Sequence, residues 1–142
     1  MFKKSNPIDK FFYPKSIAVI GASTDTDKIG GFIFSQVKKK SNIIQPVPIN
    51  VKSKEVQGIR AYPSISDAPQ VDLAIIAIPG AFVIDTVKDC ASKGIKNIVI
   101  ISAGFKETGE EGKKREDELK EIIKSEGLSV IGPNCLGFLN PE

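Results

Sequence analysis

Short apolar runs recur along the chain, and each is bounded by turn-forming or charged residues. The runs are continuous rather than alternating, and Ile and Val dominate them. Strands buried on both faces, as in a parallel sheet, have this pattern. We therefore predict four strands and a weaker fifth, at residues 16–20, 46–49, 72–78, 97–101 and 128–131.

The segments between these runs have the spacing of amphipathic helices, which we predict over residues 28–40, 81–93 and 112–126. In the first of them, the apolar face is predicted to consist of Ile29, Phe32, Ile33 and Val37. Gly94 and Gly127 follow the other two as expected C-caps. Residues 58–69 are irregular, and we expect a short extra strand and a turn there.

Alternating strands and helices predict βαβ units, and therefore a Rossmann-type, doubly wound α/β fold with a mainly parallel sheet. Right-handed crossovers bring the carboxyl ends of parallel strands to one edge. Ligands of open α/β sheets bind at that edge. Candidate functional residues should therefore directly follow Ile20, Ile49, Ile78, Ile101 and Ile131.

Composition and charge indicate the number of domains and the kinds of partner to expect. A length of 142 residues, 41% hydrophobic and 26% charged, predicts one globular domain over residues 1–142. A net charge of +3 gives no support for nucleic acid or membrane as a partner, although it is compatible with an anionic small ligand. Cys90 and Cys135 form no metal-binding motif, and they favour a reducing, cytoplasmic setting. We also interpret the lack of a terminal helix near residue 142 as a domain cut from a longer protein.

The turn after the first predicted strand has the chemistry of a phosphate cradle. Glycine allows close backbone approach, the hydroxyls donate hydrogen bonds, and the next helix start favours an anion. The turn is neither GxGxxG nor a Walker P-loop, and an ordinary capped strand-to-helix turn remains the alternative. The candidate ligand-binding residues here are Gly21, Ala22, Ser23, Thr24, Lys28, Ile29 and Gly30.

Lysines rather than an acidic residue follow the second predicted strand, in the segment Asn50-Val51-Lys52-Ser53-Lys54. A classical NAD site has an acidic residue there for the ribose diol. A lysine instead suits a phosphate on the ribose, which both NADP and coenzyme A carry. Either Lys52 or Lys54 could serve this phosphate, and both could equally be surface charges.

The loops after the remaining predicted strands add further candidates. Ile78 and Pro79 would form a stiff wall beside the ligand. The segment Ser102-Ala103-Gly104-Phe105 begins a polar loop, in which Phe105 either covers the ligand or is a core aromatic. Asn134 and Cys135 lie in a tight loop after the last strand. A nucleophilic Cys135 is disfavoured, because the chain has no histidine to activate it.

Together these loops resemble the coenzyme A-binding domain of the NDP-forming acyl-CoA synthetases, a superfamily that includes ADP-forming acetyl-CoA synthetase and the alpha subunit of succinyl-CoA synthetase. The resemblance covers residues 8 to 140. The matching segments are FYPKSIAVIGAS (12–23), AYPSI (61–65), IP (78–79), SAGFKE (102–107) and GPNCLG (132–137). One departure is Asn50-Val51-Lys52, where the family commonly has Asn-Pro-Lys.

The resemblance implies residue roles as well as a fold. Coenzyme A would lie extended across the strand edge, with Ser23, Thr24 and Lys28 at its phosphates and ribose. Lys52 would serve a phosphate. Ile78-Pro79 and Ser102 to Phe105 would line the nucleotide and pantetheine path. Asn134 and Cys135 would face the thiol end.

The resemblance also implies a reaction that this chain cannot complete. In the family, acyl-CoA and phosphate give an acyl phosphate, and a histidine carries the phosphoryl group to ADP. Without a histidine, the isolated chain is expected to be inactive, and the remaining synthetase domains or subunits become its expected partners. Two alternatives are a regulatory coenzyme A-binding module of a protein lysine acetyltransferase and an NAD(P)-binding domain. The acyl group and the oligomeric state stay open, a homo-oligomer included.

Overall fold

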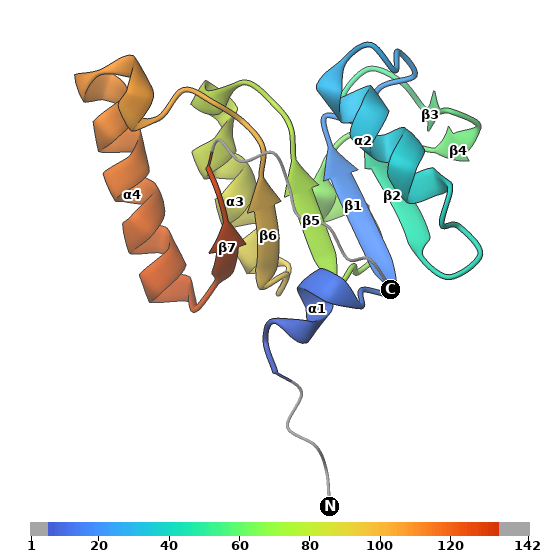
Figure 1. The fold of residues 1–142 in the computed structure, drawn as a ribbon, viewed down its shortest axis with the longest axis horizontal. Helices are drawn as coiled ribbons and strands as arrows, with labels where there is room; N and C mark the ends of the chain where they lie inside the picture. Colours follow the sequence, from blue (N-terminus) through green and yellow to red (C-terminus); the bar gives the residue numbers. More distant parts are fainter. Residues whose placement is uncertain (1–5, 134–142) are drawn as a thin grey trace, which may run out of the picture.

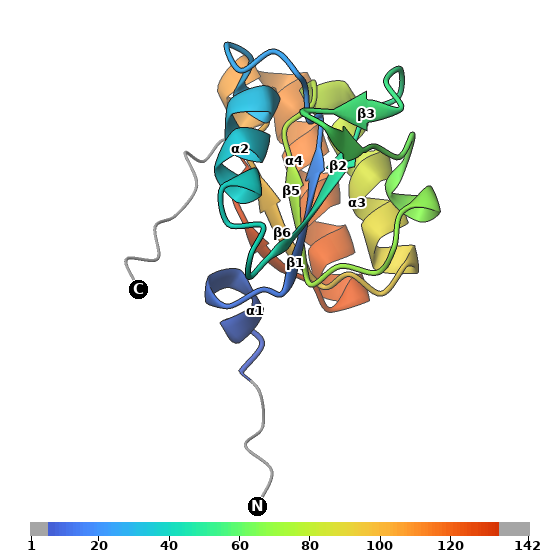
Figure 2. The same cartoon turned by 90° about the vertical axis from the view of Figure 1, so that its right-hand side faces the viewer.

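The computed structural model describes residues 6–133, which form a parallel sheet between two layers of helices (Figures 1 and 2). Five strands pair in the order β2-β1-β5-β6-β7, and every neighbouring pair in this sheet is parallel. The predicted Rossmann-type α/β class is confirmed. The strands are β1 (Ser16–Ile20), β2 (Gln45–Ile49), β5 (Leu73–Ile76), β6 (Asn97–Ile100) and β7 (Ser129–Ile131).

Helix α2 (Ile29–Lys38) covers one face of the sheet, and α3 (Val83–Ser92) and α4 (Glu110–Glu126) cover the other (Figure 2). The chain runs outward from β1 to β2 and then returns past β1 to β5, so the winding direction reverses between β1 and β5. Such a reversal leaves a crevice at the carboxyl edge of a doubly wound sheet. The short helix α1 (Asp9–Phe12) lies at the opposite edge (Figure 1).

The inward face of α2 differs from the predicted one. Ile29 and Phe32 are 56% and 54% exposed, whereas Phe34 and Val37 are buried together with Gly30 and Gly31. The reason is steric: a Cβ at Gly30 would lie 2.0 Å from the Gly21 carbonyl oxygen. The helix therefore packs through bare backbone, which a search for apolar side chains does not detect.

The irregular stretch begins earlier than predicted, with an antiparallel hairpin of β3 (Glu55–Val56) and β4 (Ile59–Arg60). Its tip carries two positive φ angles, 51° at Gln57 and 82° at Gly58. Three 3₁₀ turns complete the described elements: η1 (Ile65–Asp67), η2 (Gly80–Phe82) and η3 (Lys106–Thr108).

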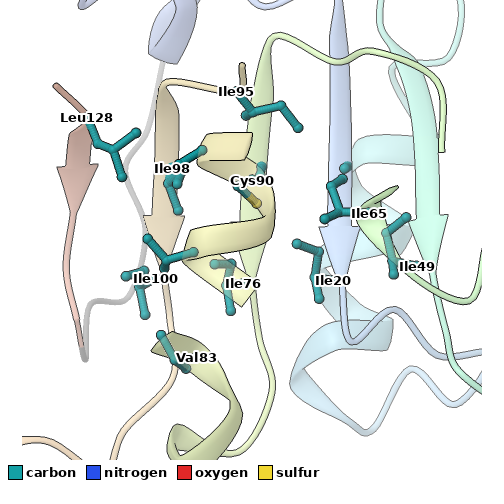
Figure 3. Close-up of a cluster of buried hydrophobic side chains, with 14 of the residues drawn as sticks. Ile20, Ile49, Ile65, Ile76, Val83, Cys90, Ile95, Ile98, Ile100 and Leu128 are labelled. Carbon is teal, nitrogen blue, oxygen red and sulfur yellow. The ribbon is translucent and has the colours of Figure 1, made fainter. Parts of the chain in front are cut away.

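The core holds the strand ends in fixed positions. All five residues of β1 are buried, and two apolar clusters pack on the two faces of the sheet. Ile20 and Ile49, the last residues of β1 and β2, meet Ile65 on the α3 side (Figure 3). The loops that follow β1 and β2 therefore start from a rigid base.

None of the described helices has both the length and the apolar character needed to cross a membrane. Within residues 6–133, no three His, Cys, Asp or Glu side chains come together in a way that could hold a metal ion.

Candidate functional site

A cavity of about 640 Å³ lies at the carboxyl ends of β1 and β2, on the crevice side of the sheet. This volume is in the usual range for small-molecule sites. Ile20, Ile49 and Ile65 form an apolar floor. Eight of the residues predicted from sequence line it: Gly21, Ala22, Ser23, Lys28, Asn50, Lys52, Ile78 and Pro79.

The turn after β1 depends on glycine at two positions. Gly21 has a φ of 94°, and a Cβ there would lie 2.2 Å from the Ala77 carbonyl oxygen. Gly30 contacts the turn from the other side, where its missing Cβ lets α2 approach the Gly21 carbonyl. Gly30 therefore supports the turn by packing, and it is not part of the cavity lining.

Helix α2 starts beside this turn, directly after Asp25, Asp27 and Lys28. Its N-cap residue is Lys28, which makes no side-chain capping hydrogen bond, and its first turn carries no acidic residue. The first N–H groups of a helix lack intrahelical partners and carry partial positive charge. This helix start, with the Lys28 ammonium beside it, is therefore suited to an anionic ligand.

Two amide side chains donate hydrogen bonds to carbonyl oxygens of the turn and of the first turn of α2. The Asn50 Nδ2 donates to the Ala22 carbonyl oxygen at 2.9 Å. The Gln57 Nε2, from the hairpin tip, donates to the carbonyl oxygens of Ser23 and Gly31, both at 2.9 Å. These carbonyl oxygens therefore already have hydrogen-bond donors from the protein itself.

Asn50 also shapes the loop after β2. Its Oδ1 accepts hydrogen bonds from the Lys52 N–H at 2.9 Å and the Ser53 N–H at 2.8 Å. Asn50 was predicted as a ligand contact. In the structure its side chain also links the loop after β1 to the loop after β2 by hydrogen bonds. Gln57 was not predicted at all, because nothing in its sequence context distinguishes it.

The two candidate lysines after β2 differ in position. Lys52 lines the cavity and Lys54 does not. Within the described residues, neither the Lys52 nor the Lys28 ammonium forms an ion pair. The geometry therefore favours Lys52 over Lys54 as a phosphate ligand.

The loop after β6, which the resemblance places on the ligand path, does not line this cavity. None of Ser102, Ala103, Gly104 and Phe105 lines the cavity. Ser102 is buried, and its Oγ accepts from the Ile78 N–H at 3.1 Å and donates to the Ile76 carbonyl at 3.5 Å. Phe105 is 0% exposed within the core, so the core-aromatic alternative is the one that the structure supports.

This same loop satisfies its own backbone groups. The Glu107 carboxylate accepts hydrogen bonds from the N–H groups of Gly104 at 2.6 Å and Phe105 at 3.0 Å. These two bonds hold the pKa of Glu107 below its ordinary value of 4.5, and the Arg115 charge adds a smaller effect. The Arg115 Nη1 in turn donates to the Gly104 carbonyl oxygen. A carboxylate of the chain itself thus occupies the place where an external anion could bind.

The loop nevertheless contacts the cavity wall indirectly. A Cβ at Gly80 would lie 2.3 Å from the Ala103 carbonyl oxygen, so the loop packs tightly against the start of η2. That contact positions Phe82, which lines the cavity and is 62% exposed.

The other predicted residues fall outside the cavity lining. Thr24 and Ile29 are exposed beside the turn. Asn134 and Cys135 lie outside the described residues.

Besides the three isoleucines of the floor, six lining residues were not predicted: Val51, Pro63, Ser64, Phe82, Thr86 and Asp89. Phe82 and Val51 are large apolar side chains left 62% and 80% exposed at the cavity. Phe82, the N-cap residue of α3, lies in line with Thr86 and Asp89 on one face of the helix, and this spacing of four and three residues is visible in the sequence. The chain segment that carries Pro63 and Ser64 is brought to the cavity by pairing of Tyr62 with Ile49, which sequence patterns did not reveal.

The described part of the chain offers no reactive thiol near the cavity. Cys90 is 0% exposed, and burial, followed by the charge of Asp89, raises its pKa to about 12. A thiol with this pKa is protonated at neutral pH and is a poor nucleophile. The geometry is that of a binding site for an anion with an apolar portion.

The comparisons with known proteins agree with that geometry. The alpha subunit of acetate–CoA ligase [ADP-forming] II from Pyrococcus furiosus is 50% identical over 134 residues, which are 94% of this chain and 29% of the relative. A protein of known crystal structure from Pyrococcus horikoshii OT3 superposes with a TM-score of 0.84 at 51% identity, covering 92% of this chain and 30% of that one.

A second solved structure is the dinucleotide-forming acetyl-coenzyme A synthetase 1 of Ca. Korarchaeum cryptofilum in complex with phosphate and ADP. It superposes with a TM-score of 0.85 at 38% identity, covering 93% of this chain and 28% of that one. The chain thus spans less than a third of the length of the proteins that it resembles. Residues 15–141 match the model of the CoA binding domain, which confirms the predicted ligand class, and the chain belongs to this family of coenzyme A-binding domains.

Proposed function

We propose that the cavity beside Gly21 binds coenzyme A, and that the chain acts as the N-terminal coenzyme A-binding part of an ADP-forming acyl-CoA synthetase. The observation that carries the proposal is the combination of an uncapped helix start, two lysines without ion pairs and an apolar floor in one cavity. Coenzyme A has the matching parts: a diphosphate, a ribose phosphate and a base. The proposal keeps the cytoplasmic setting expected from the sequence.

In this proposal the diphosphate lies over Gly21, Ala22 and Ser23 at the start of α2, next to Lys28. Backbone N–H groups at such a turn contact phosphate oxygens, and the helix dipole favours their charge. The carbonyl oxygens of Ala22 and Ser23 accept hydrogen bonds from Asn50 and Gln57, which reduces their repulsion of a phosphate. Lys52, across the cavity, pairs with the ribose phosphate.

The chemical step is assigned to other parts of the synthetase. The chain has no histidine, and Cys90 is buried. Its own residues bind and orient coenzyme A, while the acyl phosphate and phosphoryl carrier come from the remaining domains or subunits. The acid that is activated is then also selected outside this chain.

Calorimetry with coenzyme A and its dephospho form tests the proposal. Wild type should bind coenzyme A more tightly than NAD, and Lys52→Ala should weaken coenzyme A by roughly tenfold to a hundredfold, the equivalent of about 1.5–3 kcal/mol for a charge-assisted hydrogen bond. Dephospho-coenzyme A should be nearly unaffected by this change. Lys54→Ala, two residues away but outside the cavity, is the matched control.

Absence of coenzyme A binding by the wild-type chain at millimolar ligand would reject the proposed ligand site. Preference for NADP over coenzyme A would support the NAD(P)-binding alternative instead. Equal weakening of coenzyme A and dephospho-coenzyme A by Lys52→Ala would show that Lys52 does not contact the ribose phosphate.

A further inference from the structure

One wall of the cavity is formed by Phe82, the N-cap residue of helix α3, and by one face of that helix. Phe82, Thr86 and Asp89 follow at intervals of four and three residues, so they line the cavity one below the other. Phe82 stands near the sheet edge, and Asp89 lies about two helical turns further along α3. The wall therefore changes from aromatic to polar along the helix, and both Phe82 and Asp89 are exposed.

Among the described residues that line this cavity, Asp89 is the single carboxylate, and Lys28 and Lys52 line the same cavity. In the described part of the chain it forms no ion pair, because the nearby lysines have other partners. Lys88 pairs with Glu118 at 3.5 Å, and the Lys93 Nζ donates to the Ser66 carbonyl at 3.3 Å. A carboxylate repels phosphate, so the ligand portion at this wall must be one that donates hydrogen bonds.

Like Asp89, Thr86 offers a hydrogen-bond acceptor to the cavity. Its hydroxyl proton is donated to the Phe82 carbonyl oxygen at 2.9 Å, within the helix. The Thr86 Oγ1 can then only accept a further hydrogen bond. Two neighbouring acceptors, and no donor, face the cavity from this stretch of α3.

We propose that this wall recognises the exocyclic amino group of an adenine base, with Asp89 as the acceptor and Thr86 supporting it; the inference rests on the proposed coenzyme A site. The amino group supplies two N–H donors for the two acceptors. The flat faces of the base match the exposed side chains of Phe82 and Val51, since aromatic rings stack on apolar and aromatic surfaces. A base with a carbonyl oxygen at that position would meet only acceptors and bind poorly.

The test compares coenzyme A with its hypoxanthine analogue, in which the 6-amino group is replaced by a carbonyl and the phosphates are unchanged. Calorimetry on the wild-type chain should show coenzyme A binding about tenfold or more tightly than the analogue. Asp89→Asn supplies an N–H donor in place of one acceptor, so it should reduce the ratio below about threefold or reverse it. The control is Asp85→Asn, which lies one turn earlier on α3, is exposed and does not line the cavity.

Equal binding of coenzyme A and the analogue by wild type would overturn this inference while leaving the proposed ligand site intact. An unchanged ratio in Asp89→Asn would also overturn it. Loss of binding of both ligands by the wild type would instead reject the coenzyme A site on which it rests. The wild-type ratio needs no variant, so a folding defect in Asp89→Asn would not prevent the test.

Discussion

Two loops at the same edge of the sheet, residues 21–28 after β1 and residues 102–108 after β6, contain similar residue types. They differ in how their backbone groups are hydrogen-bonded. Both follow fully buried strands, and both contain glycine, hydroxyl groups and a lysine. In the first loop, the side chains of Asn50 and Gln57 hold the carbonyl groups, and the helix that follows has no acidic residue in its first turn. In the second loop, Glu107 accepts hydrogen bonds from the loop's own N–H groups.

The difference shows that composition at the carboxyl edge does not decide which loop binds an anion. The two loops differ in which backbone N–H groups have a partner. Gly104 and Phe105 both donate to Glu107. In the first loop Gly21 donates to the Ile49 carbonyl oxygen and Asp25 to the Ser23 Oγ, and among the described residues the N–H groups of Ala22 and Ser23 have no such partner.

Glu107 lies two and three residues from the amides it satisfies, a spacing visible in the sequence. Asp25 has the same spacing from Ser23 and Ala22, but its Oδ1 accepts from the Asp27 N–H instead, so the spacing alone does not show which loop is closed to external anions.

The largest expected effect is at Gly21. Gly21→Ala places a Cβ 2.2 Å from the Ala77 carbonyl oxygen in a backbone with a φ of 94°. We expect a loss of unfolding free energy of about 3 kcal/mol or more, together with loss of coenzyme A binding. Urea denaturation and calorimetry measure the two effects.

The control for Gly21→Ala is Gly58→Ala, at a φ of 82° with no atom within 4 Å of the added Cβ. Gly58→Ala should lower the unfolding free energy by only about 1–2 kcal/mol, because the added Cβ disfavours the left-handed conformation but meets no neighbouring atom. Equal losses of unfolding free energy in the two variants would contradict the tight contact between Gly21 and Ala77.

A smaller effect is expected at Gln57, which links the hairpin to the first turn. Gln57→Ala removes the donors to the carbonyls of Ser23 and Gly31, and each hydrogen bond contributes about 1 kcal/mol. We expect weaker coenzyme A binding and faster amide exchange in residues 22–31, measured by calorimetry and hydrogen exchange. Gln36→Ala, an exposed glutamine on α2 outside the cavity, is the control. Unchanged exchange in Gln57→Ala would show that the turn holds its shape without this clamp.

The smallest expected effect is at Glu107, in the loop after β6. Because hydrogen bonds lower the pKa of this carboxyl in the folded protein, ionised Glu107 stabilises the fold above pH 4.5, and this contribution is lost as the pH falls further. Glu107→Gln should therefore lower the Tm at neutral pH, and the difference from wild type should shrink in acid. Coenzyme A affinity at neutral pH should stay nearly the same. A difference in Tm that does not depend on pH would contradict the assignment.

Much of the fold could be predicted from the sequence, because buried parallel strands have long apolar runs and because Gly127 adopts the left-handed conformation expected of a C-cap. The inward face of α2 could not, since Gly30 and Gly31 pack by lacking side chains. The 3₁₀ turn η2 before α3 was likewise included in the predicted helix, because Pro79 and Gly80 suit the start of either.

The candidate site could be predicted in part. Residues next to β1, β2 and β5 follow from the rule that ligands bind at the carboxyl edge, and eight of them line the cavity. The α3 wall with Asp89 could not be found, because it depends on how a helix packs against a distant loop. The interactions of Gln57 depend on a hairpin whose contacts join residues 26 and 34 positions apart.

The most direct test of the account is a coenzyme A titration followed by amide chemical shifts in the wild-type chain. Amides of residues 21–31, together with Val51 and Lys52, should shift in proportion to ligand saturation. Amides of Gly104 and Phe105, already bonded to Glu107, should shift little. Large shifts confined to residues 102–108, with none at residues 21–31, would contradict the claim that the loop after β1 holds the ligand.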